Sequence, residues 1–489
     1  MVKPGGAQRE SDGVVVPLIA GMNPAGGKGP DFGHVGDGGK REGMAGTARP
    51  NYLDGHMPVV KVRQLQNRLW AAAKLSPERR FHALYDRIHR SDVLWEAWVR
   101  VKANRGAAGV DALTLAAVEE YGVEAMLDGL SRDLQAGKYR PSPVRRVEIP
   151  KSDGSKRPLG IPTVRDRVCQ QAAKIVLEPI FEADFLPVSF GFRPKRSATD
   201  ALEAIRVAFP RGRQFVFEAD IRDFFGRIGH ERLLALVAER VSDRRVLKLL
   251  GQWLRAGVLV DGVMSETVSG TPQGGVISPL LANIFLHAFD RAWAESGTGE
   301  LVRYADDFVV LCTSRSQAEQ AHRRAAAIMG DLGLELHPDK TRVVDLREGA
   351  EGFDFLGFHL RARMSGRLWE QQRAVRYYLH RWPSERSMKR ARARIKALTS
   401  RSMVGWELEP LIKRLNLFLR EWGNYFRTGN SADKFVSMDR HVVWRLKRLL
   451  IKKRGRNLRA GQAGRWTPSW FHDQGLHKLM GTIQYPKAA

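Results

Sequence analysis

Residues 301–312 read LVRYADDFVVLC and decide the fold of this chain. Two apolar runs flank Tyr304-Ala305-Asp306-Asp307, and their Val, Leu and Phe residues favour extended chain. A short polar break between two such runs predicts a tight β-hairpin. Its turn would hold two adjacent carboxylates, which repel each other near neutral pH unless a cation lies between them. Hard oxygen ligands of this kind suit Mg²⁺, although an ordinary Asp-rich hairpin turn is the alternative interpretation.

A third carboxylate occurs upstream in a matching context. Residues 214–228 read QFVFEADIRDFFGRI, and the alternation from Phe215 onward predicts a strand that ends at Asp220. A site for two metal ions needs carboxylates from separate strands, which converge on ions about 3.5–4 Å apart. We expect Asp220 and Asp306 to supply these carboxylates.

The two segments resemble motifs A and C of reverse transcriptases, in which D-x-x-x-x-F (220–225) is followed by Y-A-D-D (304–307). Five further segments resemble successive blocks of group II intron reverse transcriptases. They are, in chain order, VEIPKSDGSKRPLGIPT (147–163), SFGFRPKRSATDA (189–201), SGTPQGGVISPLLANIFLHAFD (269–290), GLELHPDKTRVV (333–344) and GFDFLGFHL (352–360). The resemblance is colinear from about Asn104 to near Arg456.

This resemblance implies an α/β right-hand polymerase fold, with fingers and palm over residues 57–375 and an α-helical thumb, or X domain, over 376–456. It also implies an RNA-directed DNA polymerase, a nucleotidyltransferase with two Mg²⁺ ions as cofactors. The implied catalytic residues are Asp220, Asp306 and Asp307. The implied metal ligands are Asp220, Ile221, Asp306 and Asp307.

The resemblance further implies a bacterial maturase that binds its own intron RNA, promotes group II intron splicing and supports target-primed reverse transcription in intron mobility. Its partners would be intron RNA, target DNA, the RNA template with its cDNA, and deoxynucleoside triphosphates. Two alternatives remain open. One is a host-recruited reverse transcriptase that serves defence or repair. The other is a splicing-only RNA-binding maturase, against which the intact Asp220, Asp306 and Asp307 argue.

Two cations flank a predicted hairpin in the fingers segment. Lys151 follows Pro150 at a strand end, Asp153-Gly154 favours a tight turn, and Arg157 lies on the returning strand. Together they can hold the triphosphate of an incoming nucleotide, Arg157 by bidentate contacts and Lys151 as a point charge. For either residue alone, a solvated side chain is the alternative.

The resemblance implies three more nucleotide contacts. Phe225 would lie under the sugar and select deoxynucleotides by a clash with the 2′-hydroxyl, whereas Phe224 would pack in the core. Gln273 would help to hold nucleotide and template, within a turn whose glycines allow close backbone approach. Lys340 would balance charge near the triphosphate. A core role is the alternative for Phe225.

Candidate nucleic-acid contacts are cationic and less specific. Arg193 and Arg196 in the F-R-P-K-R-S segment are candidates for template or nucleotide phosphates. Residues 385–456 hold 20 Lys or Arg against six Asp or Glu, with apolar residues at helical spacing. The basic faces of such helices can follow a phosphate backbone. The thumb cluster chosen for this role is Lys389, Arg390, Arg392 and Arg394.

The charge balance of the whole chain agrees with a polyanionic partner. Lys and Arg number 80 against 53 Asp and Glu in 489 residues, giving a formal charge of +27. No apolar run approaches the roughly 18 residues of a membrane-spanning helix. Cys169 and Cys312 are the only cysteines, too few for a disulfide framework or a zinc site of their own. We therefore expect a cytoplasmic protein, associated with the nucleoid or a ribonucleoprotein, that does not bind membranes.

The two ends of the chain differ from the rest. Residues 1–56 hold 13 Gly among the first 50 positions and show no period of a helix or strand, which predicts a flexible extension. Residues 59–100 have helical spacing, and we expect an amino-terminal extension of the fingers there. Residues 457–489 combine aromatic and basic residues, and either form a small DNA-binding remnant or pack onto the thumb. The resemblance does not extend to an H-N-H endonuclease, so we do not expect second-strand cleavage.

Overall fold

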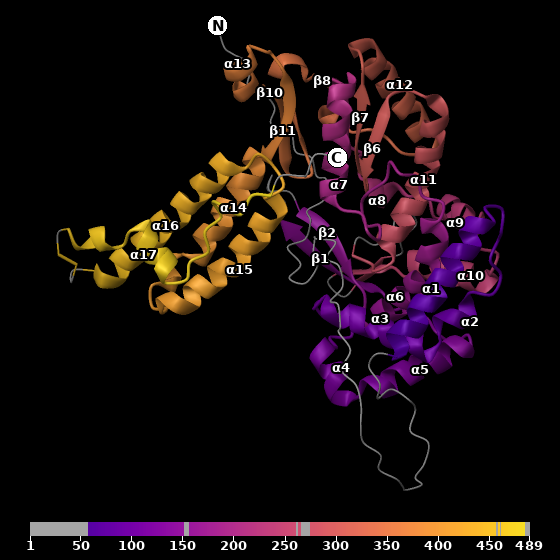
Figure 1. The fold of residues 1–489 in the computed structure, drawn as a ribbon. Helices are drawn as coiled ribbons and strands as arrows, with labels where there is room; N and C mark the ends of the chain where they lie inside the picture. The colour runs from indigo at the N-terminus through magenta and orange to yellow at the C-terminus, as the bar shows by residue number, and fades with distance from the viewer. Residues whose placement is uncertain are drawn as a thin grey trace, which may run out of the picture. The chain divides into compact units, whose positions relative to one another are not determined.

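The computed structural model describes residues 57–150, 156–260, 263–265, 274–455, 458–459 and 461–484 (Figure 1). The chain forms two compact units, each with its own apolar core. The first comprises Met1–Ser197, Ala219–Phe308 and His322–Thr341. The second comprises Ala198–Glu218, Val309–Ala321 and Arg342–Ala489.

The first unit is built around helix α6 (Val164–Glu182), most of which is buried. Thr163 caps this helix, because its hydroxyl oxygen accepts a hydrogen bond from the backbone N–H of Asp166 at 3.1 Å. Helices α1 (Met57–Leu75) and α3 (Ser91–Ala103) pack against it. The helical spacing over residues 59–100 is therefore confirmed. Its apolar positions are buried: Leu65, Leu69, Leu84, Ile88, Leu94 and Trp98.

Shorter helices complete the helical part of this unit. They are α2 (Tyr85–Ile88), α4 (Leu115–Tyr121), α5 (Val123–Gln135), α9 (His230–Ala238) and α10 (Arg244–Leu254). One buried carboxylate joins two of them: Asp243 caps α10 through the N–H of Arg245, and its other oxygen accepts from the N–H of Leu84 and Tyr85 at the start of α2.

A four-stranded sheet with the order β2-β1-β4-β5 carries the predicted fingers hairpin. Strands β1 (Val144–Pro150) and β2 (Lys156–Ile161) are antiparallel, with Ile149 opposite Arg157. Strand β4 (Val258–Val260) runs parallel to β1, and β5 (Val263–Ser265) is antiparallel to β4. The hairpin prediction is confirmed for its two strands, while the turn at 151–155 lies outside the described residues.

A second four-stranded sheet has the order β6-β7-β3-β8. Its strands are β3 (Phe215–Ala219), β6 (Glu300–Tyr304), β7 (Asp307–Cys312) and β8 (Arg342–Asp345). Strands β6 and β7 are joined by two residues, as the apolar runs of residues 301–312 predict. The all-buried pattern of β7 and the buried Phe215–Phe217 stretch of β3 explain why these runs form central strands.

Helix α11 (Ser278–Ser296) begins where the sequence places a helix at residues 277–290. It contacts α6 and α9. The ring of Phe289 lies 5.1 Å from that of Phe308 at the start of β7, so α11 packs against the hairpin. The four positions predicted to face the core are buried: Leu280, Ile284, Leu286 and Phe289. Helix α12 (Arg315–Asp331) follows β7.

The second unit contains a three-stranded antiparallel sheet with the order β11-β10-β9. Its strands are β9 (Gly352–Phe355), β10 (Phe358–Met364) and β11 (Tyr377–Pro383). Helix α7 (Ala198–Ala208) belongs to the same unit, and α13 (Gly366–Gln372) connects β10 to β11. The turn between β9 and β10 requires glycine, since Gly357 has a φ of 79°.

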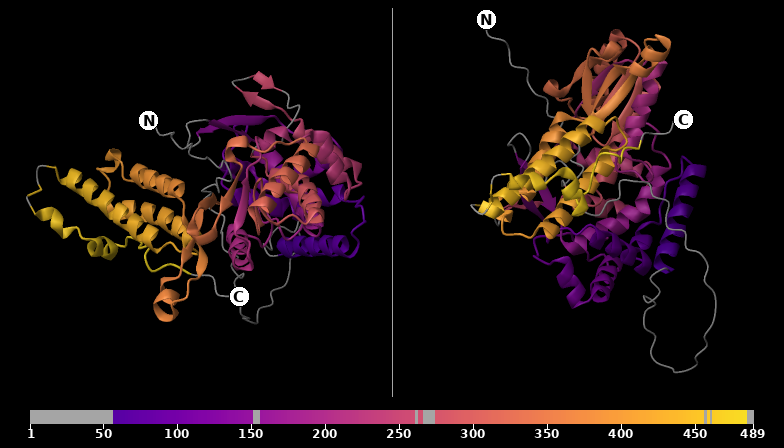
Figure 2. Two further views of the ribbon diagram at one scale, coloured as in Figure 1. Left: turned by 90° about the horizontal axis from the view of Figure 1, so that it is seen from above. Right: turned by 60° about the vertical axis from the view of Figure 1, so that its left-hand side comes forward.

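Three helices form the rest of this unit: α14 (Glu385–Leu398), α15 (Leu408–Phe426) and α16 (Ala432–Arg454). They lie side by side in both views of Figure 2. Their apolar stripes face one another, which confirms the helical spacing of the sequence. The buried positions of α15 and α16 include Leu411, Leu415, Phe418, Trp422, Phe426, Phe435, Met438, Val442, Leu446 and Leu449.

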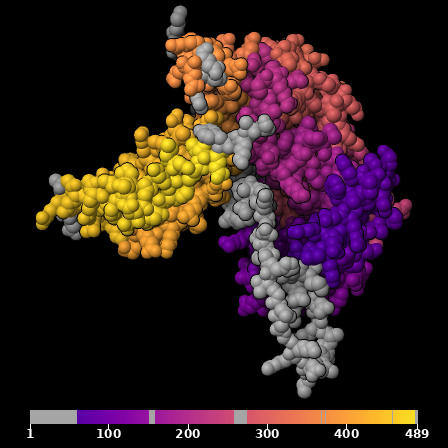
Figure 3. All heavy atoms as spheres, in the orientation of Figure 1, coloured from indigo at the N-terminus to yellow at the C-terminus, as the bar shows by residue number. Residues whose placement is uncertain are grey.

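The C-terminal segment packs onto these helices (Figure 3). It includes helix α17 (Pro468–Asp473), and buries Trp466, Phe471, Leu476 and Leu479. Asn416 of α15 donates to the carbonyl of Gly475 at 2.7 Å, and Asp439 of α16 accepts from the N–H of Leu479 at 3.0 Å. Of the two interpretations left open for this segment, the structure shows packing; DNA binding stays a prediction.

Leu415→Ala tests the helical packing. Leu415 is fully buried in α15, so its truncation should lower the free energy of unfolding by about 2–5 kcal/mol. Leu417→Ala is the matched control, because Leu417 lies on the same helix but is 74% exposed, and it should change stability by less than about 0.5 kcal/mol. Thermal and urea unfolding of both variants would measure the difference. Equal effects at the two positions would contradict the packing described.

Candidate active site

Asp220 directly follows β3 and is 6% exposed. The chain around it pairs with residues 335–337: the carbonyl of Asp220 accepts from the N–H of His337 at 2.8 Å, and the N–H of Arg222 donates to the carbonyl of Glu335 at 2.8 Å. An antiparallel bridge between Ile221 and Leu336 lies between these two bonds. Two backbone hydrogen bonds therefore fix the position of Asp220 within the first unit.

Asp306 and Asp307 lie at the turn between β6 and β7. Asp307 opens β7 and is 6% exposed, whereas Asp306 is half-buried. Ala305 has a φ of 57°, a conformation that costs a non-glycine residue about 1–3 kcal/mol and persists where surrounding contacts impose it. Because β7 is next to β3 in the sheet order, neighbouring strands carry all three aspartates.

Lys340 lies at the end of a short 3₁₀ helix (Pro338–Lys340). Its Nζ is 3.1 Å from Oδ2 of Asp220, and the two side chains are 10% and 8% exposed. The sequence places Lys340 near a triphosphate; the structure shows that its ammonium pairs with Asp220. The pairing of residues 335–337 with Asp220 explains this placement, since it brings the following turn next to the carboxylate.

The donor chemistry of these residues fits Mg²⁺, which prefers carboxylate and carbonyl oxygens. Ile221 can offer only its carbonyl, because its side chain is a hydrocarbon. In the part of the chain that the structure describes, no group of three or more His, Cys, Asp or Glu side chains is arranged to hold a metal ion. Bringing the three aspartates onto shared ions would require Asp220 to exchange its Lys340 contact for a metal bond.

Phe224 and Phe225 begin the short helix α8 (Phe224–Arg227). Phe224 is 2% exposed and its ring lies 6.3 Å from that of Phe285, which confirms the core role expected for it. Phe225 is half-buried, with its ring 5.1 Å from that of Phe224. Part of the Phe225 ring is exposed and could contact a nucleotide sugar. Its role in sugar selectivity stays a prediction.

The segment before α11 confirms one prediction and adds a residue. Gly274 has a φ of 113°, and a Cβ there would lie 2.5 Å from the carbonyl oxygen of Gly160 in β2. Close backbone approach therefore requires glycine, as the sequence suggests. Gln170 of α6 accepts from the N–H of Val276 at 2.9 Å and anchors the segment. No sequence pattern predicts this role of Gln170, because it is a single polar residue on a buried helix and belongs to no motif.

Three predicted nucleotide contacts cannot be placed in full. Lys151 and Gln273 lie outside the described residues. Arg157 is described only through its backbone in β2, where it pairs with Ile149. Their roles remain predictions.

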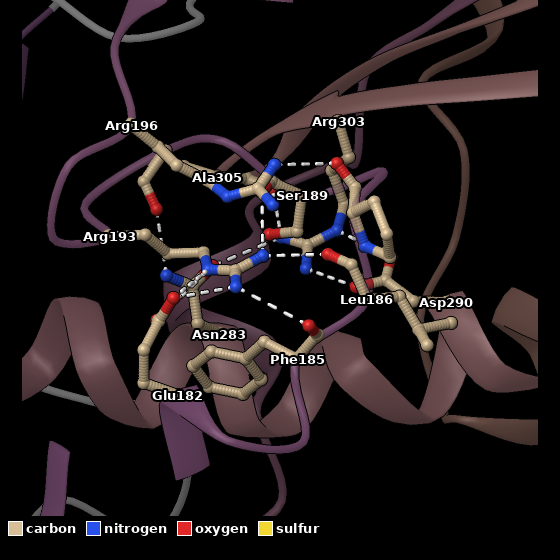
Figure 4. A network of polar contacts seen from close by, with 12 residues as sticks. Glu182, Phe185, Leu186, Ser189, Arg193, Arg196, Asn283, Asp290, Arg303 and Ala305 are labelled. Carbon is tan, nitrogen blue, oxygen red and sulfur yellow. Dashed lines mark hydrogen bonds and ion pairs between the residues drawn. The ribbon is translucent and has the colours of Figure 1, made fainter. Parts of the chain in front are cut away.

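Arg193 has a structural role in place of the predicted phosphate contact (Figure 4). Its side chain is 3% exposed and forms a bidentate pair with Glu182 of α6. The remaining guanidinium N–H groups donate to the carbonyls of Phe185, Leu186 and Ser189. All five donors of an arginine are thus engaged inside the protein. The geometry argues against a phosphate contact and shows Arg193 shaping the 185–189 loop.

Arg196 is half-buried. It donates to the carbonyl of Pro187 at 2.8 Å, and its guanidinium lies 5.2 Å from the ring centroid of Phe190.

The thumb cluster lies on α14. Lys389, Arg390 and Arg394 are exposed, whereas Arg392 is half-buried beside Glu385 at 3.4 Å. The pKa of Arg390 is lowered by desolvation and by the charge of Arg386. The second cause shows that the positive charge of Arg386 acts on Arg390.

Three charged or polar residues near the turn carry no motif signal of their own. Arg303 in β6 is fully buried and pairs with Asp290 of α11, and Asn283 of α11 accepts from it. The only sequence signal is the charge of Arg303 inside the apolar run of residues 301–312.

Burial raises the pKa of Tyr304, which follows Arg303 in the chain. Burial lowers the pKa of His287 on α11 to about 4, so His287 is neutral near pH 7.

Comparisons with known proteins decide the family. Residues 149–360 match the family described as "Reverse transcriptase (RNA-dependent DNA polymerase)". Residues 388–466 match the "Group II intron, maturase-specific domain". Protein YkfC of Escherichia coli (strain K12) is 33% identical over 341 residues, which are 61% of this chain and 88% of YkfC. The chain belongs to the group II intron reverse transcriptase and maturase family.

Other family members are similar over shorter shares of their length. Group II intron-encoded protein LtrA of Lactococcus lactis subsp. cremoris is 41% identical over 351 residues, so the chain spans 58% of LtrA. An uncharacterized 91 kDa protein in the cob intron of Schizosaccharomyces pombe is 27% identical over 64% of this chain and 47% of that protein. The resemblance stated from the sequence motifs is thereby confirmed.

Family membership also confirms the predicted fold and enzyme class. The chain has an α/β reverse transcriptase domain followed by a helical maturase domain, and it is an RNA-directed DNA polymerase with a role in intron splicing. Nucleic acids, intron RNA among them, are its substrates and partners. Within the described residues, no helix is both long and apolar enough to cross a membrane.

Proposed function

We propose that Asp220, Asp306 and Asp307 form the polymerase site of this chain and extend a DNA primer along an RNA template. The proposal is supported by the sheet order: Asp220 directly follows β3, Asp306 and Asp307 lie at the start of β7, and these two strands are neighbours within the reverse transcriptase domain. Carboxylates that share ions need cations to offset their repulsion, and the chain supplies one cation, Lys340, at 3.1 Å from Asp220.

The reaction is an in-line displacement in which the primer 3′-hydroxyl bonds to the α-phosphorus of a deoxynucleoside triphosphate and pyrophosphate leaves. Two Mg²⁺ ions, when bound, favour the ionised hydroxyl and neutralise the pyrophosphate charge. Asp220 and Asp306 would hold both ions, with Asp307 and the carbonyl of Ile221 completing the ligand set. Lys340, once separated from Asp220, keeps a positive charge beside the triphosphate.

Four residues that the family resemblance singles out would hold the incoming nucleotide. Lys151 and Arg157 of the fingers hairpin bind the triphosphate. Gln273 contacts the nucleotide and the template; the segment that follows it is anchored through Gly274 and Gln170. Phe225 excludes the 2′-hydroxyl.

The exposed cations of α14 bind the phosphate backbone of the intron RNA. Lys389, Arg390 and Arg394 are exposed, so phosphates of an RNA can approach them from solvent. Target DNA and the template duplex would be bound during target-primed reverse transcription. The intact carboxylates favour this polymerase over a splicing-only maturase.

Asp306→Ala should abolish cDNA synthesis on a primed RNA template, because the ions lose a shared ligand. RNA binding should survive, since the thumb and fingers supply most of it. Asp331→Ala is the control: Asp331 is exposed at the end of α12, in the same unit, and its loss should leave synthesis unchanged. Primer extension with a filter-binding assay would measure both. Near wild-type extension by the Asp306 variant would refute the site.

Phe225→Ala should retain deoxynucleotide incorporation and admit ribonucleotides, because the clash with the 2′-hydroxyl is removed. Phe224→Ala offers a contrast at the neighbouring ring: Phe224 is 2% exposed, so its loss should reduce stability without changing sugar selectivity. Competing incorporation of the two nucleotide classes on one template measures the ratio. An unchanged ratio in a folded Phe225 variant would assign the ring to the core.

Replacing Lys389, Arg390, Arg392 and Arg394 with Gln should weaken intron RNA binding and flatten its salt dependence. Each lost phosphate contact should reduce the log–log salt slope by about 0.7–0.9. A control with the same charge change replaces four exposed cations of the first unit: Lys138, Arg244, Arg323 and Arg324. Titrations from low to physiological salt would compare the slopes. If the thumb variant kept the wild-type slope, α14 would not be an RNA-binding surface.

A further inference from the structure

We propose that the buried ion pair between Arg303 and Asp290 positions the turn that carries Asp306 and Asp307, and that Arg303 and Asp290 are therefore positioning residues for the polymerase site. The inference rests on the proposed function of that turn. It adds two residues that would act through the position of the turn and not by direct contact with the nucleotide; Figure 4 shows Arg303 beside Asp290 and Ala305.

Arg303 is fully buried, and its side chain bonds both to Asp290 of α11 and to Ala305 of the turn. Its Nε donates to Oδ1 of Asp290 at 2.7 Å, and one terminal nitrogen donates to Oδ2 at 2.5 Å, which gives a bidentate pair. The other terminal nitrogen donates to the carbonyl oxygen of Ala305 at 2.9 Å. Arg303 thus connects α11 directly to the residue that precedes Asp306.

The residue of the turn that Arg303 bonds to, Ala305, has a strained backbone conformation. Ala305 has a φ of 57°, and such a conformation persists only where neighbouring contacts impose it. The hydrogen bond from Arg303 to the carbonyl of Ala305 is one such contact. It orients the peptide group that leads into Asp306, so it also orients the two carboxylates that follow.

The loop of residues 188–191 packs against β6 and the turn through its backbone. The N–H of Phe190 donates to the carbonyl of Arg303 at 2.8 Å, and the N–H of Arg303 donates to the carbonyl of Val188 at 2.8 Å. A Cβ on Gly191 would lie 2.4 Å from the backbone nitrogen of Ala305. The backbone of the loop therefore lies directly against the turn.

Asn283 joins this loop to the ion pair. Its amide nitrogen donates to the carbonyl of Gly191 at 2.8 Å, and its amide oxygen accepts from Arg303 at 3.1 Å. Asn283 and Asp290 lie on α11, which packs against β7 through Phe289 and Phe308. The turn is thus enclosed by helix α11, by the 188–191 loop and by Arg303, which bonds to both.

Stability alone does not account for a charged pair at this place. Burying two charges is costly, and apolar residues of similar volume often stabilise a protein equally well or better. An apolar residue at position 303 would continue the apolar run of β6 but could not donate to Ala305. The hydrogen bond to the turn is what the arginine adds.

Arg303→Lys tests the proposal, because it keeps the charge but loses the bidentate pair and the fixed fork of donors. Displacing catalytic groups by about 1 Å can cost about 100-fold in rate. We expect kcat for primer extension to fall by about 10–100-fold, while the KM for deoxynucleotides and the Kd for primer–template stay near wild type. Hydrogen exchange of the backbone amides of residues 304–308 should become faster.

Arg240→Lys is the matched control. Arg240 is 6% exposed in the same unit, pairs with Asp184 at 3.0 Å and donates to the carbonyl of Ala73. Like Arg303, it is a buried arginine with a carboxylate partner, but its described contacts are with Asp184, Ala73 and Ser76 and not with the turn. Its replacement should lower Tm and leave kcat per folded molecule and the exchange at 304–308 unchanged. An Arg303 variant that behaves like this control would refute the proposal.

A double variant, Arg303→Met with Asp290→Leu, separates position from stability. Removing both charges together should restore Tm toward wild type, whereas kcat should remain low because the bond to Ala305 is still missing. Recovery of kcat together with Tm would show that the pair only stabilises the fold. If the wild-type protein extended no primer, the proposed function would fail, and amide exchange at 304–308 would still decide whether Arg303 holds the turn.

Discussion

Repulsion between carboxylates is the constraint on which this structure depends. Asp306 and Asp307 are adjacent in the chain, and Asp220 lies at the end of the neighbouring strand. Like charges on adjacent residues raise the free energy of the folded protein unless cations offset them. Lys340 offsets part of the charge at Asp220, from a turn that two backbone hydrogen bonds hold in place. In the proposed function, Mg²⁺ would offset the remaining charge, and the same repulsion would favour its binding.

A rigid surrounding is the second requirement, because catalysis by metal-bound carboxylates depends on their geometry. Helix α6 is buried along most of its length and anchors two segments, the loop shaped by Arg193 and the segment that follows Gln273. Helix α11 packs behind the hairpin and supplies Asp290 to Arg303. The Arg193 and Arg303 guanidinium groups thus do similar work: each replaces water around loop carbonyls with donors in a fixed geometry.

Local patterns predicted much of this from the sequence. The hairpin at residues 301–312, the strand that leads to Asp220 and the apolar stripes of α15 and α16 depend on residues close in the chain. All three are confirmed, although β3 ends at Ala219, one residue before Asp220. The close approach at Gly274 followed from the same kind of local rule. Two features could not be predicted from local patterns: the inward direction of the Arg193 side chain and the Arg303–Asp290 ion pair. A guanidinium can reach solvent or an internal carboxylate, and only tertiary contacts decide which. The hydrogen bond of Gln170 to Val276 could not be predicted either, because it also depends on tertiary contacts.

The most direct measurement of the central claim is an experimental structure of the protein with a chain-terminated primer on an RNA template, a deoxynucleoside triphosphate and Mn²⁺, whose anomalous scattering locates the ions. We predict two Mn²⁺ ions bonded by Asp220 and Asp306, beside Asp307, with Nζ of Lys340 moved away from the 3.1 Å contact that it now makes with Asp220. Ions bound elsewhere, with Lys340 still paired to Asp220 beside a bound nucleotide, would contradict the account.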